Sequence, residues 1–129
     1  LLDMEWHSLP ADAPLQDIEK FEQQALTKHG VNVPFVPPRY KSAFFSHSMG
    51  GGYSAGYYAY MWSEILAADA FAYVQEQGGL TRKMGDKYRK EILEVGNSRD
   101  LMGSFKAFRG QEPATSALLK RRGLKATVQ

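Results

Sequence analysis

The residues of this chain that best suit chemistry are gathered in one uncharged stretch, FSHSMGGGYSAGYYAYMW, at residues 45–62. No Asp, Glu, Lys or Arg occurs between Ser42 and Ser63, and the stretch holds one histidine, three consecutive glycines and four tyrosines. A tyrosine hydroxyl, with a pKa of about 10, stays protonated at neutral pH and can donate a hydrogen bond. Histidine can donate through either ring nitrogen. Such groups could bind a polar ligand or stabilise a negatively charged oxygen that develops during a reaction.

The spacing of these residues suits a binding surface better than a core. Each buried tyrosine hydroxyl needs a hydrogen-bond partner, and three glycines give up packing and cost backbone entropy. Tyr57 and Tyr60 lie three residues apart, on one face of a helix, so both can point at one ligand. Gly50, Gly51 and Gly52 supply a loop that can adopt positive φ and approach a peptide closely. We therefore expect a small or extended ligand to lie against this segment.

Structural interpretations of the same residues remain open. His47 could be a hydrogen-bonded structural histidine, and the glycine triplet could be a plain turn. Tyr58 and Trp62 are expected to pack in a core, because aromatic residues at helical spacing mostly pack. His7 and His29 are expected to be surface or capping groups, since neither has a partner at metal-ligand spacing.

Length and composition predict one domain with a sizeable core. The chain has 129 residues, of which 43% are hydrophobic and 23% charged, as in ordinary globular proteins. It has no cysteine, which excludes disulfides and thiolate metal sites and fits a reducing compartment. No apolar run approaches the roughly 20 residues that span a bilayer, and the first residues lack the pattern of a signal peptide. These features favour a cytoplasmic location without membrane contact.

The net charge of +2 hides an asymmetry between the two halves of the chain. Residues 80–125 carry twelve Lys and Arg against five Asp and Glu, and the rest carries four against nine. A nucleic-acid binder that uses this basic half with exposed tyrosines is one alternative function. The basic residues are mixed with acidic ones in helical patterns, which is typical of solvated helix faces. The aromatic residues also cluster outside the basic half, so we expect no nucleic-acid partner.

The segments that must position the tyrosines are predicted to be helical, so the fold class is all-α with at most a minor extended piece. We predict four successive parts: helices over 1–30, a proline-rich extended connector and the glycine-rich loop over 31–52, a long helix over 53–77, and C-terminal helices over 78–129. Helix starts are expected near Asp12, Thr81, Ser98 and Glu112. The prolines of the connector exclude helix there. The long helix is apolar on most faces, which predicts that it is buried in something larger.

The run HSMGGGYSAGYYAY, residues 47–60, resembles the signature segment of the thimet oligopeptidase family of zinc oligopeptidases. Its three-glycine form is most similar to the peptidyl-dipeptidase (dipeptidyl carboxypeptidase) branch. Further segments that resemble this family are WSE at 62–64, DAF at 69–71, GGL at 78–80, GNS at 96–98, FRG at 108–110 and RRGL at 121–124. The resemblance covers nearly the whole chain. It implies the C-terminal segment of a larger, mostly helical zinc metallopeptidase that releases dipeptides from peptide C-termini.

The resemblance also implies roles for individual residues. In the family, the positions that match His47, Tyr53, Tyr57 and Tyr60 face the catalytic cleft. Tyr57 and Tyr60 would then bind substrate and stabilise the oxyanion, with Tyr60 in direct contact. His47 and Tyr53 would hold the peptide backbone, and the glycine loop, residues 50–52, would close over the substrate.

The zinc of this family is bound by a helical HExxH motif and a later Glu, and this chain has no such motif. Its three histidines are not paired at i, i+4. The resemblance therefore implies zinc in the longer enzyme, with ligands and general base outside this chain, and no activity for the chain alone. Its partners would be short peptides as substrate and the upstream part of the same polypeptide.

One alternative to a peptidase is a non-catalytic helical module that holds a peptide or another ligand in the glycine–tyrosine loop. A matching polypeptide that carries HExxH would favour the peptidase. We also expect the isolated chain to self-associate, because the long helix would expose more apolar surface than a soluble monomer usually tolerates.

Overall fold

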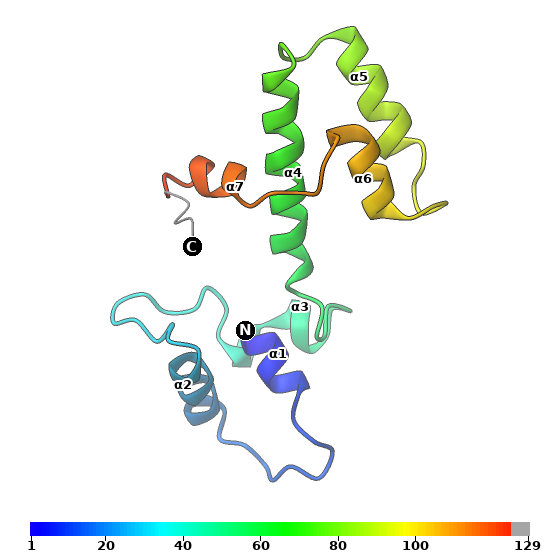
Figure 1. Ribbon diagram of the computed structural model, residues 1–129. Coiled ribbons are helices and arrows are strands. Elements are labelled where there is room, and N and C mark those ends of the chain that lie inside the picture. The colour runs from blue at the N-terminus through cyan, green and yellow to red at the C-terminus, as the bar shows by residue number, and fades with distance from the viewer. Residues whose placement is uncertain (125–129) are drawn as a thin grey trace. The chain divides into compact units, whose positions relative to one another are not determined.

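The computed structural model describes residues 1–124, and within that range it consists of helices and irregular segments without a β-strand (Figure 1). The predicted all-α class is therefore confirmed. The chain divides into two compact units, Leu1–Tyr60 and Met61–Gln129. No helix in the described part of the chain is long and apolar enough to cross a membrane.

The first unit contains α1 (Leu2–His7), α2 (Ile18–Lys28), the 3-10 helix η1 (Ser42–Phe44) and α3 (Ser46–Met49). α2 begins later than the predicted start near Asp12, because Asp17 is its N-cap and accepts a hydrogen bond from the Lys20 N–H at 3.0 Å. Within residues 31–52, predicted to be an extended connector and a glycine-rich loop, the structure places the short helices η1 and α3.

Helix α1 packs against α2 and η1 through its side chains. The Trp6 and Phe21 ring centroids lie 3.9 Å apart, and the Trp6 indole N–H donates to the Ser42 hydroxyl at 2.8 Å. The Ser42 N–H and hydroxyl both donate to Glu22, at 2.7 and 2.9 Å. His29 follows α2 as its C-cap residue and lies 2.7 Å from a Glu5 carboxylate oxygen. These contacts fix α1, which carries Asp3.

The second unit contains most of α4 (Ala59–Glu76), α5 (Arg82–Tyr88), the π-helix η2 (Arg89–Leu93), α6 (Leu101–Arg109) and α7 (Ser116–Arg121). Thr81 caps α5 as predicted and accepts from the Met84 N–H at 3.2 Å. Asp100, not the predicted Ser98, caps α6 and accepts from the Gly103 N–H at 2.6 Å. A carboxylate at the N-cap is favoured further by the helix dipole.

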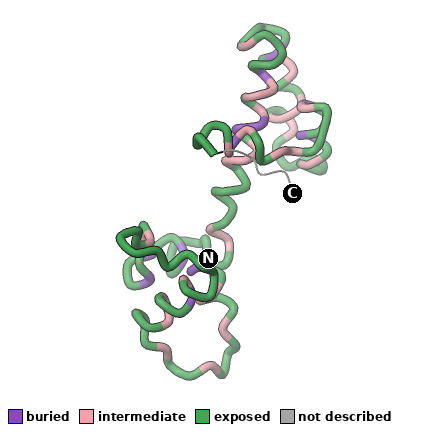
Figure 2. The backbone as a smooth tube through the Cα atoms, turned by 60° about the vertical axis from the view of Figure 1, so that its left-hand side comes forward, coloured by how far each residue is buried: buried purple, intermediate pink, exposed green. Residues whose placement is uncertain are grey.

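Phe108 is the centre of the core of the second unit and is 0% exposed. It packs with Val74 and Met84, while the rings of Tyr73 and Tyr88 meet it edge-on, with centroids 5.4 and 5.3 Å away. Buried positions occur in both units among many exposed ones (Figure 2). The core is therefore made by α4, α5 and α6 together.

Asp69 joins three segments of the second unit and is 2% exposed. It accepts hydrogen bonds from Arg109 Nε at 3.2 Å and from the Ala114 N–H at 3.3 Å. Arg109 Nη1 also lies 3.3 Å from a Glu76 carboxylate oxygen. This network holds α4, α6 and the segment before α7 together, and a buried carboxylate needs such partners.

Many basic residues of the C-terminal half lie in ion pairs. Those that pair with a carboxylate are Arg82, Arg89, Arg99, Lys106, Arg109 and Arg122. Their charge is thus partly neutralised locally. Apart from Arg109, whose pair with Asp69 is buried, this agrees with the interpretation of these residues as solvated helix faces.

The long helix α4 starts at Ala59 rather than at residue 53. Residues 54–58 form turns, and Ala55 has a positive φ of 54°. The N–H groups of Ala55 and Tyr57 donate to the Asp3 carboxylate instead of taking part in a helical ladder. The helix start is therefore set by a residue more than fifty positions away in the sequence.

Candidate functional site

The glycine-rich loop requires glycine at two of its three positions. A Cβ on Gly51 would lie 2.9 Å from the His47 Cα and 3.1 Å from the His47 carbonyl oxygen, which is too close for a real contact. Gly52 has a φ of +81°, a conformation that other residues rarely adopt. The Tyr53 N–H donates to the His47 carbonyl at 3.1 Å and closes the loop. The loop therefore folds tightly back on α3.

The side chains predicted for the site lie together around this loop. The His47 ring centroid lies 5.7, 6.0 and 6.4 Å from those of Tyr53, Tyr57 and Tyr60. The Tyr60 ring stacks on Tyr53 at 5.3 Å and is tilted against Tyr57 at 5.1 Å. We call these four side chains the His–Tyr cluster. It lies wholly within the first unit, next to the three glycines.

The His–Tyr cluster is accessible to solvent rather than packed into the core. Tyr53 and Tyr60 are 39% and 48% exposed, His47 is exposed and Tyr57 is half-buried. Tyr57 also packs edge-on against the buried Phe45, with centroids 4.7 Å apart. The cluster thus has one anchored ring and three rings that a ligand can reach.

Tyr60 is held in its protonated form. Hydrogen bonding with the Tyr53 side chain, followed by partial burial and the neighbouring phenols, raises the pKa of Tyr60 above its usual 10.0. A phenol in this state is a hydrogen-bond donor across the whole physiological pH range. It can therefore bind a carbonyl oxygen or stabilise an oxyanion without losing its proton.

Asp3 is a residue of the site that the sequence analysis missed. It is 3% exposed, and its carboxylate accepts hydrogen bonds from the Ser48 hydroxyl, the Ala55 N–H at 2.9 Å and the Tyr57 N–H at 3.0 Å. His7 Nδ1 lies 3.0 Å from the same carboxylate. In the sequence the only hint is the i, i+4 spacing of Asp3 and His7, and Glu5 between them makes Asp3 look like an ordinary acidic residue of a first helical turn.

Two opposing effects act on the Asp3 carboxyl. Burial by itself raises the pKa of Asp3, but the hydrogen bonds from Ser48, Tyr57 and Ala55 and the nearby His7 outweigh burial. The net result is a pKa below the ordinary value of 3.8. The carboxylate is therefore charged at neutral pH, although it is buried.

Two aromatic residues next to the cluster in the sequence are more exposed than predicted. Tyr58 and Trp62 were expected in a core, but they are 56% and 54% exposed. Because α4 starts only at Ala59, Tyr58 belongs to the preceding turn and does not lie on a face of this helix. The expectation that both residues pack inside this chain is wrong.

The described residues do not form a metal site. No group of three or more His, Cys, Asp or Glu side chains among residues 1–124 is placed to hold a metal ion. The donors of the His–Tyr cluster are one imidazole and three phenols, which do not match a zinc site of His and carboxylate ligands. This chain's own residues therefore do not fit zinc.

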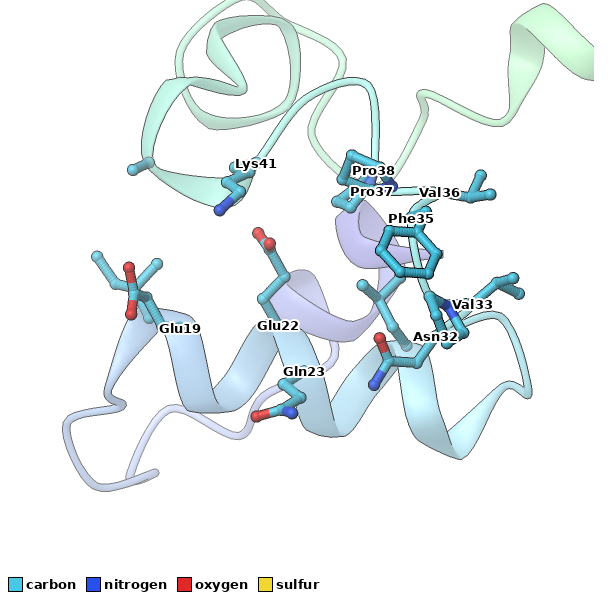
Figure 3. Close-up of a pocket in the computed structure, with 14 residues that line it drawn as sticks. Glu19, Glu22, Gln23, Asn32, Val33, Phe35, Val36, Pro37, Pro38 and Lys41 are labelled. Atoms are coloured by element: carbon cyan, nitrogen blue, oxygen red, sulfur yellow. The ribbon is translucent and has the colours of Figure 1, made fainter.

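A separate open cavity of about 530 Å³ lies in the first unit between α2 and the proline-rich connector (Figure 3). Figure 3 shows Glu19, Glu22 and Gln23 on the helix side and Phe35, Pro37 and Pro38 on the connector side. Phe35 has a positive φ of 64° and is fully exposed. No residue of the His–Tyr cluster lines this cavity, so it is distinct from the candidate site.

Comparison with known proteins gives a consistent result. Residues 1–124 match the sequence model of Peptidase family M3. The chain is 50% identical over 124 residues to a dipeptidyl carboxypeptidase of Salmonella typhimurium and 47% identical to one of Escherichia coli. Each alignment covers 96% of this chain and 18% of the relative. Oligopeptidase A of Escherichia coli is 47% identical over 81 residues, 63% of this chain and 12% of the relative.

Proposed function

Because this chain belongs to peptidase family M3, we propose that it supplies the substrate-binding and transition-state-stabilising wall of a longer metallopeptidase that releases dipeptides from the C-termini of peptides. The observation that carries this proposal is the convergence of His47, Tyr53, Tyr57 and Tyr60 beside the glycine-rich loop. The chain spans 18% of the length of the two dipeptidyl carboxypeptidases that it resembles, so the activity is proposed for a longer polypeptide.

The phenols of Tyr57 and Tyr60 fit the demands of amide hydrolysis. Attack on an amide carbonyl produces a tetrahedral intermediate whose oxygen carries a negative charge. Donors that are fixed in advance stabilise this charge without reorganisation. Tyr60 is exposed, and its pKa is raised by its contact with Tyr53, so its hydroxyl keeps the proton that it must donate. Tyr57 lies 5.1 Å away, ring to ring, and acts as the second donor.

His47, Tyr53 and the glycines Gly50, Gly51 and Gly52 are proposed to bind the peptide backbone. His47 and Tyr53 both adjoin the loop, and the three glycines are exposed, so a ligand can reach the loop backbone. Peptide main chains offer alternating donors and acceptors that such groups can match. This arrangement would hold the scissile bond against Tyr60.

The metal of the reaction is proposed to come from elsewhere in the longer polypeptide. Zinc would supply a polarised water when bound. The described residues offer no set of ligands for it, so zinc ligands and general base would lie outside this chain. The chain alone is accordingly proposed to be inactive and to depend on the rest of the polypeptide, in the cytoplasm as the composition favours.

The test uses the full-length polypeptide and a short peptide with a free C-terminus. Tyr60→Phe is expected to lower kcat by about 10²–10³, with a much smaller change in KM, because the hydroxyl acts mainly in the transition state. Tyr57→Phe is expected to cause a milder fall. Tyr58→Phe is the matched control, since Tyr58 is an exposed phenol outside the His–Tyr cluster.

Two results would contradict the proposal in different ways. A kcat for Tyr60→Phe within about twofold of the unmodified enzyme would remove the transition-state role. Mass spectrometry of the products decides the other part. Cleavage only at internal bonds, without stepwise loss of dipeptides, would contradict the dipeptide-releasing activity.

A further inference from the structure

The strongest unexplained feature of the first unit is the buried carboxylate of Asp3. A buried charge is costly unless several hydrogen bonds satisfy it. Three donors from the segment around the glycine loop reach this carboxylate: the Ser48 hydroxyl and the N–H groups of Ala55 and Tyr57. None of these groups is proposed to touch substrate. Asp3 therefore has a role in the arrangement of the loop.

The donors come from both ends of the loop. Ser48 lies on α3 directly after His47 and is 0% exposed. Ala55 and Tyr57 lie in the turns that follow the glycines. The Ser54 hydroxyl also donates to the Ser48 carbonyl at 2.6 Å, which adds a direct link between the two ends. One carboxylate thus fixes where the loop begins and where it ends.

The bond to the Tyr57 N–H also determines the position of two rings. The Tyr60 N–H donates to the Tyr57 carbonyl at 3.3 Å, so the backbone of Tyr57 leads directly into the first turn of α4. Ala55 has a φ of 54°, which a non-glycine residue holds only where its surroundings enforce it. The hydrogen bond from its N–H to Asp3 is one such constraint.

We propose that Asp3 is a positioning residue that sets the separation of His47 from Tyr57 and Tyr60 by binding both ends of the glycine-rich loop. This inference rests on the proposed function, because the rings must act on substrate for their spacing to affect turnover. Asp3 reaches no substrate itself and acts through Ser48, Ala55 and Tyr57.

Asp3→Asn is the direct test, because asparagine keeps one oxygen and replaces the other by an N–H₂ group. The N–H₂ group stands either opposite the Tyr57 N–H or opposite the donors that bind the other oxygen, such as the Ala55 N–H. Two donors then face each other, so at least one hydrogen bond is lost. A shift of about 1 Å in a catalytic group can cost about 10²-fold in rate, so we expect kcat to fall about 10- to 100-fold. Asp12→Asn is the matched control, because Asp12 is exposed.

The expected readouts separate positioning from a general loss of structure. In the full-length enzyme, amide hydrogen exchange at Ala55 and Tyr57 should become faster by about tenfold or more in Asp3→Asn, while Asp12→Asn leaves it unchanged. The kcat loss should shrink to less than about threefold when Asp3→Asn is made in the Tyr60→Phe background, because both changes remove the same contribution. Ser48→Ala gives a milder version of these effects if Asp3→Asn does not fold.

Failure of this inference differs from failure of the proposed function. If Tyr60→Phe is impaired but a folded Asp3→Asn keeps kcat within about twofold, Asp3 does not position the tyrosines. Asp3 also does not position the tyrosines if Asp3→Asn lowers kcat by the same factor in the unmodified enzyme and in the Tyr60→Phe variant. If Tyr60→Phe and Tyr57→Phe are themselves unimpaired, the proposed function fails, and the role of Asp3 in turnover fails with it.

Discussion

Gly51 lies against His47 so closely that a Cβ on Gly51 would come within 2.9 Å of the His47 Cα. The atoms in the way belong to the backbone of His47 and Ser46, which cannot rotate aside. The histidine of the His–Tyr cluster is therefore located by direct contact with the glycine loop. This contact also explains why the middle residue of the triplet is a glycine.

Gly51→Ala is expected to destabilise the protein by about 1–3 kcal/mol, the usual cost of overpacking, and to lower kcat/KM by moving His47. Gly50→Ala is the matched control for the stability measurement, because the nearest atom to a Cβ there is the Ser46 carbonyl oxygen at 3.8 Å, an ordinary contact. Thermal unfolding and peptide hydrolysis measure the two effects. Equal behaviour of the two variants would show that the loop relaxes freely around an added methyl group.

The Asp3 carboxylate should make the first unit sensitive to acid. Its pKa in the folded state lies below 3.8, so its contribution is fully present above the pKa of the unfolded chain and is lost as pH falls through the folded pKa. Asp3→Asn should therefore lower the free energy of unfolding at pH 7 by about 1.5–3 kcal/mol, the range for a hydrogen bond to a charged group. The difference between the two proteins should shrink below about pH 4.

Urea unfolding between pH 3 and pH 7 checks this dependence. His7 is the titratable group that faces the carboxylate, at 3.0 Å, so a His7→Gln background separates its charge from that of Asp3. Asp12→Asn should show no pH-dependent difference from the unmodified protein. A difference between Asp3→Asn and the unmodified protein that stays constant down to pH 3 would contradict the lowered pKa.

The buried pair of Arg109 with Asp69 should matter far more than the exposed pair of Arg122 with Glu64. Arg109→Leu leaves the Asp69 carboxylate 2% exposed without its main partner, at an expected cost of about 3–5 kcal/mol. Arg122→Leu removes a pair at 2.6 Å whose side chains are 52% and 35% exposed, and solvent screens it, so the change should be small. Denaturant unfolding compares the variants. Equal losses would mean that the Asp69 network does not hold α4 and α6 together.

The His–Tyr cluster could be predicted because its members are close in the sequence. Residues 47–60 hold five polar aromatic side chains and four glycines, so the members of the cluster are joined by short segments. The N-cap Thr81 was predicted correctly, whereas Asp17 and Asp100 cap their helices in place of the predicted Asp12 and Ser98, although their capping bonds also span three residues.

Features that depend on distant residues were not predictable. The Ala55 and Tyr57 N–H groups that donate to the Asp3 carboxylate lie 52 and 54 positions away in the sequence. In the sequence, Asp3 resembles any acidic residue in a first helical turn. The start of α4 was therefore placed too early, because the sequence gives no sign that these N–H groups are engaged elsewhere.

The isolated chain is expected to self-associate through α4. Met61, Trp62 and Phe71 on this helix are 62%, 54% and 54% exposed. Burial of apolar surface gains about 25 cal/mol per Å², and patches above a few hundred Å² are uncommon on monomers. Two copies that cover these side chains would therefore be more stable than one.

Sedimentation of the 129-residue chain over a range of concentrations tests this expectation. Trp62→Gln combined with Phe71→Gln should shift the equilibrium toward the monomer, since both changes remove apolar surface on α4. Gln75→Ala is the control, because it alters an exposed polar residue of the same helix. If the unmodified chain stays monomeric at millimolar concentration and binds no hydrophobic-surface dye, the exposed side chains of α4 do not drive association. That result would mean that the exposed face of α4 is stable in water and does not need to be covered by the rest of a longer polypeptide.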